Sequence, residues 1–343
     1  MIKPASGSAL QSRENIDTWR IRVLSLVLRQ DFLLLVFFVG MAGAFSAFNP
    51  RFFSIAAAAN ILQDFSPVVL MAIGQTFIIA SGGIDLSVGS TLGIAGVIMA
   101  LVIRTLTEKS CDPIPAVVLG LAAAGAVGGI IGLANGLLIS YLRIVPFVAT
   151  LATMGAAAGM SLVITGGVQI AGAPQAVILI GNVRYFGMLT VPVMAVLLII
   201  VIAWASLSLT RFGRWTYAIG SNLFASRAAG INVQKHFLKI YVLSGILSAL
   251  AGAFVYFRLG SGSPLSGRGG ELSAIAAAVI GGVSLQGGVG RLTGVVLGAL
   301  ITTSILSGLI LVGVEPNWQQ IVVATLIAIA VGMQGLGRIA SAQ

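Results

Sequence analysis

The chain has 343 residues, of which 58% are hydrophobic and only 8% are charged, with a net charge of +10. A soluble domain of this length carries about 25% charged residues, so the composition excludes a single water-soluble globule. The basic excess does not indicate nucleic-acid binding, because the basic residues lie between apolar runs and form no basic face with interleaved aromatics. The composition therefore predicts an all-α, polytopic membrane protein.

Two regions follow from the order of polar and apolar sequence. Residues 1–31 form a polar, basic arm that we expect in the cytoplasm, and residues 32–338 are expected to form one transmembrane domain. The domain contains about ten apolar segments near the ~20 residues that a spanning helix needs. They are 32–48, 61–80, 87–104, 114–140, 146–166, 190–210, 237–257, 272–286, 292–312 and 318–335. The eighth is short and glycine-rich, so we expect it to be broken or to span only in part.

The positions of the basic residues predict the orientation. Ten crossings place both ends of the chain on one side of the membrane. With a cytoplasmic N-terminus, 13 of the 19 lysines and arginines fall in inside segments and 6 in outside segments. Because cytoplasmic loops are enriched in Lys and Arg, both termini are predicted to be cytoplasmic.

A short polar stretch, residues 80–89, separates the second and third segments. An acidic side chain at or near membrane depth is costly and is usually paired or functional. For Asp85 two interpretations stay open: it caps the N-terminus of the next helix, or it takes part in gating or the solute path. Gln75, Asn135 and Glu271 are further pathway candidates.

Glycines suggest close packing and duplication. Two sets of glycines are spaced i, i+4, i+8, which creates a flat helix face for tight internal packing or for a dimer contact. They are Gly128, Gly132 and Gly136, and Gly290, Gly294 and Gly298.

Residues 82–86 resemble residues 281–285, which suggests the weak internal repeat that is common in transport proteins. Chance similarity between glycine-rich segments is the alternative.

The segment from Arg211 to Lys239 is the longest polar interruption on the predicted inside. Ser221 or Asn222 can cap a short helix there, and Gly230 can end it. We interpret this helix as a docking element for a soluble partner, with an interfacial helix on lipid headgroups as the alternative. His236, the only histidine, is expected to be solvated among the neighbouring basic residues.

A polar loop and the absence of catalytic or metal-binding motifs complete the sequence pattern. Residues 258–271 are polar and glycine-rich, so we expect a flexible surface connection on the outside. Cys111 is the only cysteine, no Gly-Lys pair forms a Walker A phosphate loop, and no His, Asp and Glu cluster is visible. We therefore expect no catalytic residue, no metal site and no cofactor bound by this chain, and a nucleotide-driven function would need another subunit.

Four separated motifs, read in order, resemble the permeases of ribose-type (monosaccharide) ABC importers, over about residues 60–335. They are residues 74–89, 145–151, 218–232 and 271–288. The resemblance implies a bacterial inner-membrane pore of two permease copies, a cytoplasmic ATPase that binds ATP and Mg²⁺, and a periplasmic sugar-binding protein. It implies that residues 218–230 are the helix that couples to the ATPase, with Ala218, Gly220, Ser221, Asn222, Ala225, Arg227, Ala228 and Gly230 as coupling residues. It does not locate a sugar site.

The main alternative is a secondary transporter driven by an ion gradient. Such a protein shares repeats and broken helices, but it needs membrane-embedded ionisable groups to bind the coupling ion. Asp85 is the only strong candidate in this sequence.

Overall fold

The computed structural model describes residues 30–341, so the predicted arm at residues 1–31 lies almost wholly outside the described residues. Within the described range the chain is helical, and its only β-type contacts are two isolated bridges. The elements are α2 (Gln30–Phe48), η1 (Pro50–Phe53), α3 (Ile55–Ala80), α4 (Val88–Glu108), α5 (Pro113–Ser140), α6 (Pro146–Thr165), α7 (Gln175–Asn182), α8 (Val191–Leu209), α9 (Arg211–Ser221), α10 (Leu223–Ala228), α11 (Val233–Leu259), α12 (Gly270–Ile280), α13 (Leu292–Leu311), η2 (Pro316–Trp318) and α14 (Gln319–Ser341).

The predicted polytopic helical bundle is confirmed. Eight of the described helices are long and apolar enough to cross a membrane: α2, α3, α4, α5, α6, α8, α11 and α13. Two shorter apolar segments, Gly270–Ile280 and Gln319–Gly332, correspond to the eighth and tenth predicted spans. At about 1.5 Å per residue, α12 covers roughly half of the ~30 Å hydrocarbon core. The eighth segment is therefore a partial span.

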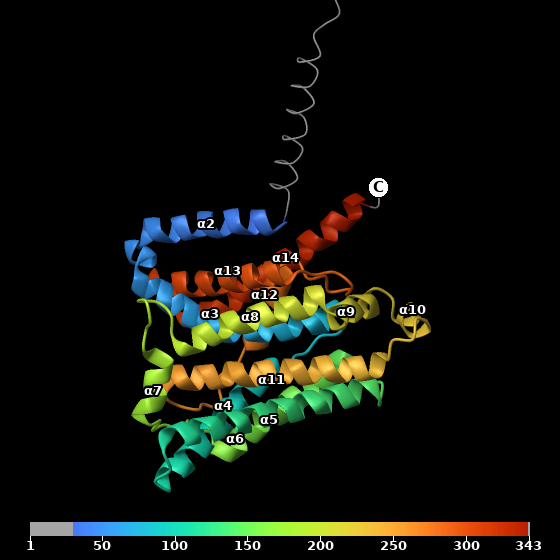
Figure 1. Ribbon diagram of the computed structural model, residues 1–343. Helices are drawn as coiled ribbons and strands as arrows, with labels where there is room; N and C mark the ends of the chain where they lie inside the picture. The colour runs from blue at the N-terminus through green and yellow to red at the C-terminus, as the bar shows by residue number, and fades with distance from the viewer. Residues whose placement is uncertain (1–29, 342–343) are drawn as a thin grey trace, which may run out of the picture.

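The long helices lie side by side, and the bundle has two distinct ends (Figure 1). The helices α9 and α10 lie at one end, and α2 begins and α14 ends toward that same end. The turn between α4 and α5, which contains Cys111, lies with α7 at the opposite end. The described chain thus enters and leaves the bundle on one side.

Glycines bring α5 and α11 into backbone contact. A Cβ added at Gly128 would overlap the carbonyl of Gly245, and a Cβ at Gly245 would overlap the carbonyl of Gly128. Further along α5, Gly132 faces the carbonyl of Tyr241, and Gly136 lies against Leu238. The first predicted glycine face therefore lies against another helix of the same chain.

The second predicted glycine face is shorter than expected. Gly294 and Gly298 lie on α13 and face the carbonyls of Gly281 and Ala277, at the end of α12. Gly290 was predicted to continue this face, but it precedes the first residue of α13 and packs against the Val283 side chain. Only two of the three glycines therefore share a helix face.

The turns after α3 and α12 have the same backbone geometry. Gly82 and Gly282 have positive φ angles of 88° and 87°, a conformation that glycine adopts without a steric penalty. The N–H of Gly83 bonds to the Ile78 carbonyl at 2.9 Å, and the N–H of Val283 bonds to that of Ala278 at 3.0 Å. The geometry pairs Gly82 with Gly282, so the sequence alignment with Gly281 was wrong by one residue.

The expectation of a flexible surface connection at residues 258–271 was also wrong. A Cβ at Gly89 or at Gly93 of α4 would overlap backbone of this segment, at Gly267 and Ser266 respectively. Gly262 pairs with Ile170 through two backbone hydrogen bonds of 2.8 and 2.9 Å. The segment is packed into the bundle because glycines on both sides allow the backbones to touch, and it places the start of α12 beside α4.

Candidate transport and coupling site

The predicted coupling segment forms two helices rather than one. Ala218, Gly220 and Ser221 belong to the end of α9, and α10 begins after Asn222. Of the two predicted caps, Asn222 caps α10, because its side-chain oxygen accepts the N–H of Ala225 at 2.9 Å. Beyond α10, Gly230 has a positive φ of 81° and reverses the chain toward α11.

Most side chains of the helix α10 are exposed. Phe224 is 79% exposed, and Ala225, Arg227 and Ala228 are also exposed, whereas Ser226 is buried. A large exposed aromatic residue on a short capped helix is costly in water unless another surface covers it. The exposed side of α10 therefore fits both predicted interpretations, a docking surface for a protein and an interfacial contact with lipid headgroups.

The helix α9 links α10 to the segments that follow α3 and α12. Gly220 lies so close to the carbonyl of Ala80 and the N–H of Gly288 that no Cβ fits there. Tyr217 donates a hydrogen bond of 2.7 Å to the carbonyl of Gly290. Burial raises the pKa of Tyr217 above its ordinary value, against the opposing effect of the Arg291 charge, so the phenol remains a donor at neutral pH. The helix α9 therefore contacts both segments.

His236 lies inside the protein, so its predicted solvation was wrong. It is 3% exposed, and its Nε2 lies 2.9 Å from the Thr216 hydroxyl. Its ring centroid is 4.8 Å from that of Phe212. Since Thr216 and Phe212 belong to α9, His236 fixes α9 against the start of α11.

A buried polar network lies inside the bundle, next to the turn after α3. Asp85 is 2% exposed and is its centre. The network, called the Asp85 cluster below, connects α3, α5, α6 and α11 through the turn. Its members are Gln75, Asp85, Ser87, Asn135, Thr153 and Ser244.

Each member of the Asp85 cluster contacts the next. The Asp85 carboxylate accepts the N–H of Ser87 at 2.8 Å and its hydroxyl at 2.6 Å. The amide of Asn135 donates to the Ser87 hydroxyl at 2.9 Å, and Thr153 donates to Asn135 at 2.6 Å. Gln75 binds the backbone of Asp85. The cluster thus ties four helices to one turn, because each buried polar group needs a partner.

The structure also shows the surroundings of two predicted residues, Asp85 as a helix cap and Glu271 as a pathway candidate. Asp85 accepts the N–H of Ser87, the residue just before α4, and not an N–H of the first helical turn. This is a local turn contact beside the helix start rather than the expected N-cap bond. Glu271 begins α12 and lies beside Gly89 of α4. Among the described residues it makes no side-chain hydrogen bond to the Asp85 cluster.

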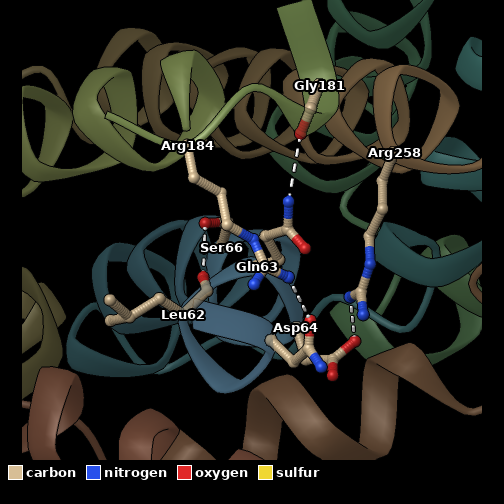
Figure 2. A network of polar contacts seen from close by, with 8 residues as sticks. Leu62, Gln63, Asp64, Ser66, Gly181, Arg184 and Arg258 are labelled. Carbon is tan, nitrogen blue, oxygen red and sulfur yellow. Dashed lines mark hydrogen bonds and ion pairs between the residues drawn. The ribbon is translucent and has the colours of Figure 1, made fainter. Parts of the chain in front are cut away.

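A second polar network, which the sequence analysis missed, joins α3, α7 and the end of α11 (Figure 2). The helix α7 lies at the end of the bundle opposite α10 (Figure 1). Arg258 at the end of α11 forms an ion pair with Asp64 of α3. The Gln63 side chain donates to the Gly181 carbonyl at 3.1 Å, which holds α7 against α3. An acid and a glutamine beside a proline in a predicted apolar span were the available signal.

Two adjoining cavities border this network. One, of about 260 Å³, is lined by Gln63, Asp64 and Arg258. The other, of about 290 Å³, extends between α3, α12 and α14. Both are lined by Pro67. Because proline has no N–H, Pro67 leaves the Gln63 carbonyl without its usual helical partner. The cavities therefore combine donors, acceptors and charge.

Metal-ligand chemistry is not visible in the described part of the chain, where no three His, Cys, Asp or Glu residues lie together. Long apolar helices around a buried polar network define a multi-pass membrane protein. The comparison with known proteins identifies the family more closely. Residues 57–331 match the family described as branched-chain amino acid transport system / permease component, and the chain belongs to it.

Curated relatives cover most of the chain. The ribose import permease protein RbsC of Escherichia coli strain K12 is 39% identical over 292 residues, covering 83% of this chain and 88% of that protein. RbsC of Bacillus subtilis strain 168 is 41% identical over 288 residues, 83% of this chain and 87% of that protein. The galactose/methyl galactoside import permease protein MglC of Haemophilus influenzae is 34% identical over 346 residues, 96% and 98% of the two chains. No solved structure matches. The chain is thus a multi-pass inner-membrane transport permease.

Proposed function

We propose that this chain is the membrane-spanning subunit of an ATP-driven importer for a monosaccharide or a related polyhydroxylated solute. Relatives that cover most of the chain are ribose and galactose permeases, which supports this solute class. Two permease copies form the pore, a cytoplasmic ABC ATPase binds at α10, and a periplasmic binding protein delivers the solute at the opposite end. The chain itself binds no cofactor, because ATP and Mg²⁺ belong to the ATPase.

The observation that carries the proposal is the connection from α10 through α9 to the turns at Ala80 and Gly288. The exposed residues of α10 contact the ATPase, with Phe224, Ala225 and Ala228 at the contact. Arg227 lies at the edge of this surface, beside the cavity beneath α10. Gly220 passes the movement to both turns, because its backbone touches them directly. Ala218, Ser221, Asn222 and Gly230 hold the two helices in position.

The solute path begins, in this proposal, at the cavities beside Asp64 and Arg258. A sugar hydroxyl needs a polar partner wherever water is excluded, and this region offers a carboxylate, a guanidinium and the Gln63 carbonyl. The Asp85 cluster lies deeper and sets the position of the turn before α4. Gln75, Asn135 and Asp85 act there as gate residues, and Glu271 acts from the start of α12.

The decisive experiment is ATP-driven uptake by the chain reconstituted with its ATPase and binding protein. Phe224→Asp removes the exposed aromatic group and should lower uptake by more than about tenfold, as loss of a central contact residue does. The wild-type chain with the same ATPase and binding protein is the reference, and both preparations are compared at equal membrane amounts. Wild-type uptake by Phe224→Asp would rule out α10 as the coupling surface.

An ion-gradient transporter makes a different prediction for the same preparation. The purified chain alone would then accumulate solute when a proton or sodium gradient is applied across the vesicle membrane. Under our proposal it does not, because the energy comes from ATP hydrolysis on another subunit.

A further inference from the structure

A cavity of about 470 Å³ lies beneath α10, between the α5–α6 turn and the start of α11. The spanning helices α5, α6 and α11 end or begin beside it. It therefore lies at the level where the bundle leaves the hydrocarbon core. None of the residues assigned above to the Asp85 cluster lines it.

Two guanidinium groups line this cavity, those of Arg143 and Arg227. Neither makes an ion pair or a hydrogen bond with any described side chain, and no carboxylate lines the cavity. Arg143 has a positive φ of 55° in the tight turn between α5 and α6, a rare conformation outside glycine. Two unpaired cations beside one cavity favour an anionic ligand, and guanidinium matches phosphate oxygens in two-pronged geometry.

A buried hydroxyl adds a second, independent feature. Ser140 lines the cavity, and its Oγ is buried without a hydrogen-bond partner among the described residues. Its carbonyl accepts the Gln234 amide at 3.3 Å, so the backbone is already satisfied. Buried polar groups without a partner are unfavourable, and a rotation of the Ser140 side chain would let its hydroxyl donate a hydrogen bond to an anionic oxygen in the cavity.

The rim of the cavity is apolar and faces outward. Leu142 is 68% exposed and Val145 is 63% exposed, and both belong to the α5–α6 turn that forms one wall. Tyr141 and Phe147 beside them are also exposed. A soluble anion gains nothing from such a rim, whereas the acyl chains of a lipid would cover it. Basic pockets between spanning helices on the cytoplasmic side are suited to acidic lipid headgroups.

We propose that this cavity binds the phosphate headgroup of an anionic phospholipid, with Arg143, Arg227 and Ser140 as its ligands and the acyl chains along Leu142 and Val145. That the lipid comes from the cytoplasmic leaflet rests on the orientation in the proposed function. The bound lipid connects the α5–α6 turn to α10.

Native mass spectrometry of the full-length purified chain tests this site, with phosphatidylglycerol and phosphatidylcholine of identical acyl chains as probes. The wild-type chain should retain phosphatidylglycerol in preference to phosphatidylcholine. Since each basic residue near an anionic headgroup contributes about fivefold in affinity, Arg143→Gln should weaken retention by at least about fivefold. Arg143→Gln/Arg227→Gln should abolish the preference. Arg211→Gln is the matched control, because Arg211 is exposed at the same end but does not line the cavity.

Three results would overturn the proposal. Equal retention of both lipids by the wild-type chain means that no headgroup is recognised. An equal loss in Arg211→Gln means that a diffuse basic surface attracts the lipid. Displacement of phosphatidylglycerol by millimolar inorganic phosphate, with phosphate retained in its place, means a site for a soluble anion. Because no ATPase is present, failure here leaves the proposed transport function unaffected, and normal lipid binding with no ATP-driven uptake would reject that function alone.

Discussion

The N–H of Gly288 donates a hydrogen bond of 2.8 Å to the carbonyl of Ala80, so the last residue of α3 is tied to the segment between α12 and α13. The two residues lie near the turns at Gly82 and Gly282, which share one backbone geometry, and the bond therefore joins the segments that contain these turns. Gly220 of α9 lies against the same bond. The helix α9, which α10 follows at the surface, thus contacts the bond that links these two segments.

Replacing Gly220 with alanine tests this connection. The new Cβ would overlap the Ala80 carbonyl, so α9 must shift, at a cost of about 1–3 kcal/mol for overpacking. We expect ATP-driven uptake to fall strongly while the chain remains in the membrane. Gly155→Ala on α6 is the control, because its Cβ would meet nothing within 4 Å. Wild-type uptake by Gly220→Ala would show that coupling does not pass through this contact.

Orientation can be measured with the single native cysteine. Cys111 lies in the α4–α5 turn, at the end of the bundle opposite α10. A membrane-impermeant maleimide added to intact cells, with the outer membrane made permeable, should label Cys111 from the periplasm. In a Cys111→Ser/Phe224→Cys variant, position 224 should react only after the inner membrane is also opened. The reverse pattern would place α10 outside and remove the basis for ATPase docking.

Hydropathy and capping chemistry were sufficient to predict much of this architecture. The apolar segments correspond to helices because the bilayer sets their length, and the partial span at α12 followed from its short, glycine-rich sequence. Asn222 and Gly230 marked the limits of α10 because their side-chain and backbone chemistry is local.

Features that depend on distant contacts were not predictable in the same way. Gly89 and Gly93 allow residues 258–271 to pack into the bundle. A glycine-rich sequence is equally typical of a flexible loop, so the sequence alone did not indicate this packing. His236 lies among basic residues in the sequence, yet it shares a buried helix face with Val233 and Ile240. That helical spacing was a usable signal. The pairing of Asp64 with Arg258 joins positions 194 residues apart, which no local pattern reveals.

The contact between α5 and α11 gives a matched pair of glycine substitutions. In Gly132→Ala the new Cβ would overlap the Tyr241 carbonyl and lie 2.8 Å from the Val242 Cα, both in the backbone of α11. We expect the free energy of unfolding to fall by about 1–3 kcal/mol. Gly125→Ala on the same helix meets nothing within 4 Å and should be neutral or stabilising by up to about 1 kcal/mol. Thermal unfolding in detergent measures both.

The outcome of that comparison also bears on assembly. If Gly132→Ala were as stable as Gly125→Ala but changed the oligomeric state, α5 would contact a second copy rather than α11. The structure predicts the opposite, because the face of α5 at Gly128 and Gly132 is already occupied.

Two substitutions at Asp85 can show whether its carboxylate is needed for the structure or whether its negative charge is needed for transport. In Asp85→Asn the side-chain oxygen can still accept the Ser87 N–H and hydroxyl, which now lie 2.8 and 2.6 Å from the carboxylate. In Asp85→Leu both donors lose their acceptor inside the bundle, which costs about 1–3 kcal/mol for each unsatisfied group. We therefore expect Asp85→Asn to retain both stability and ATP-driven uptake, and Asp85→Leu to lose both. If Asp85→Asn instead remained fully stable but lost uptake, the negative charge itself would be required, and an ion-coupled mechanism would become the better explanation.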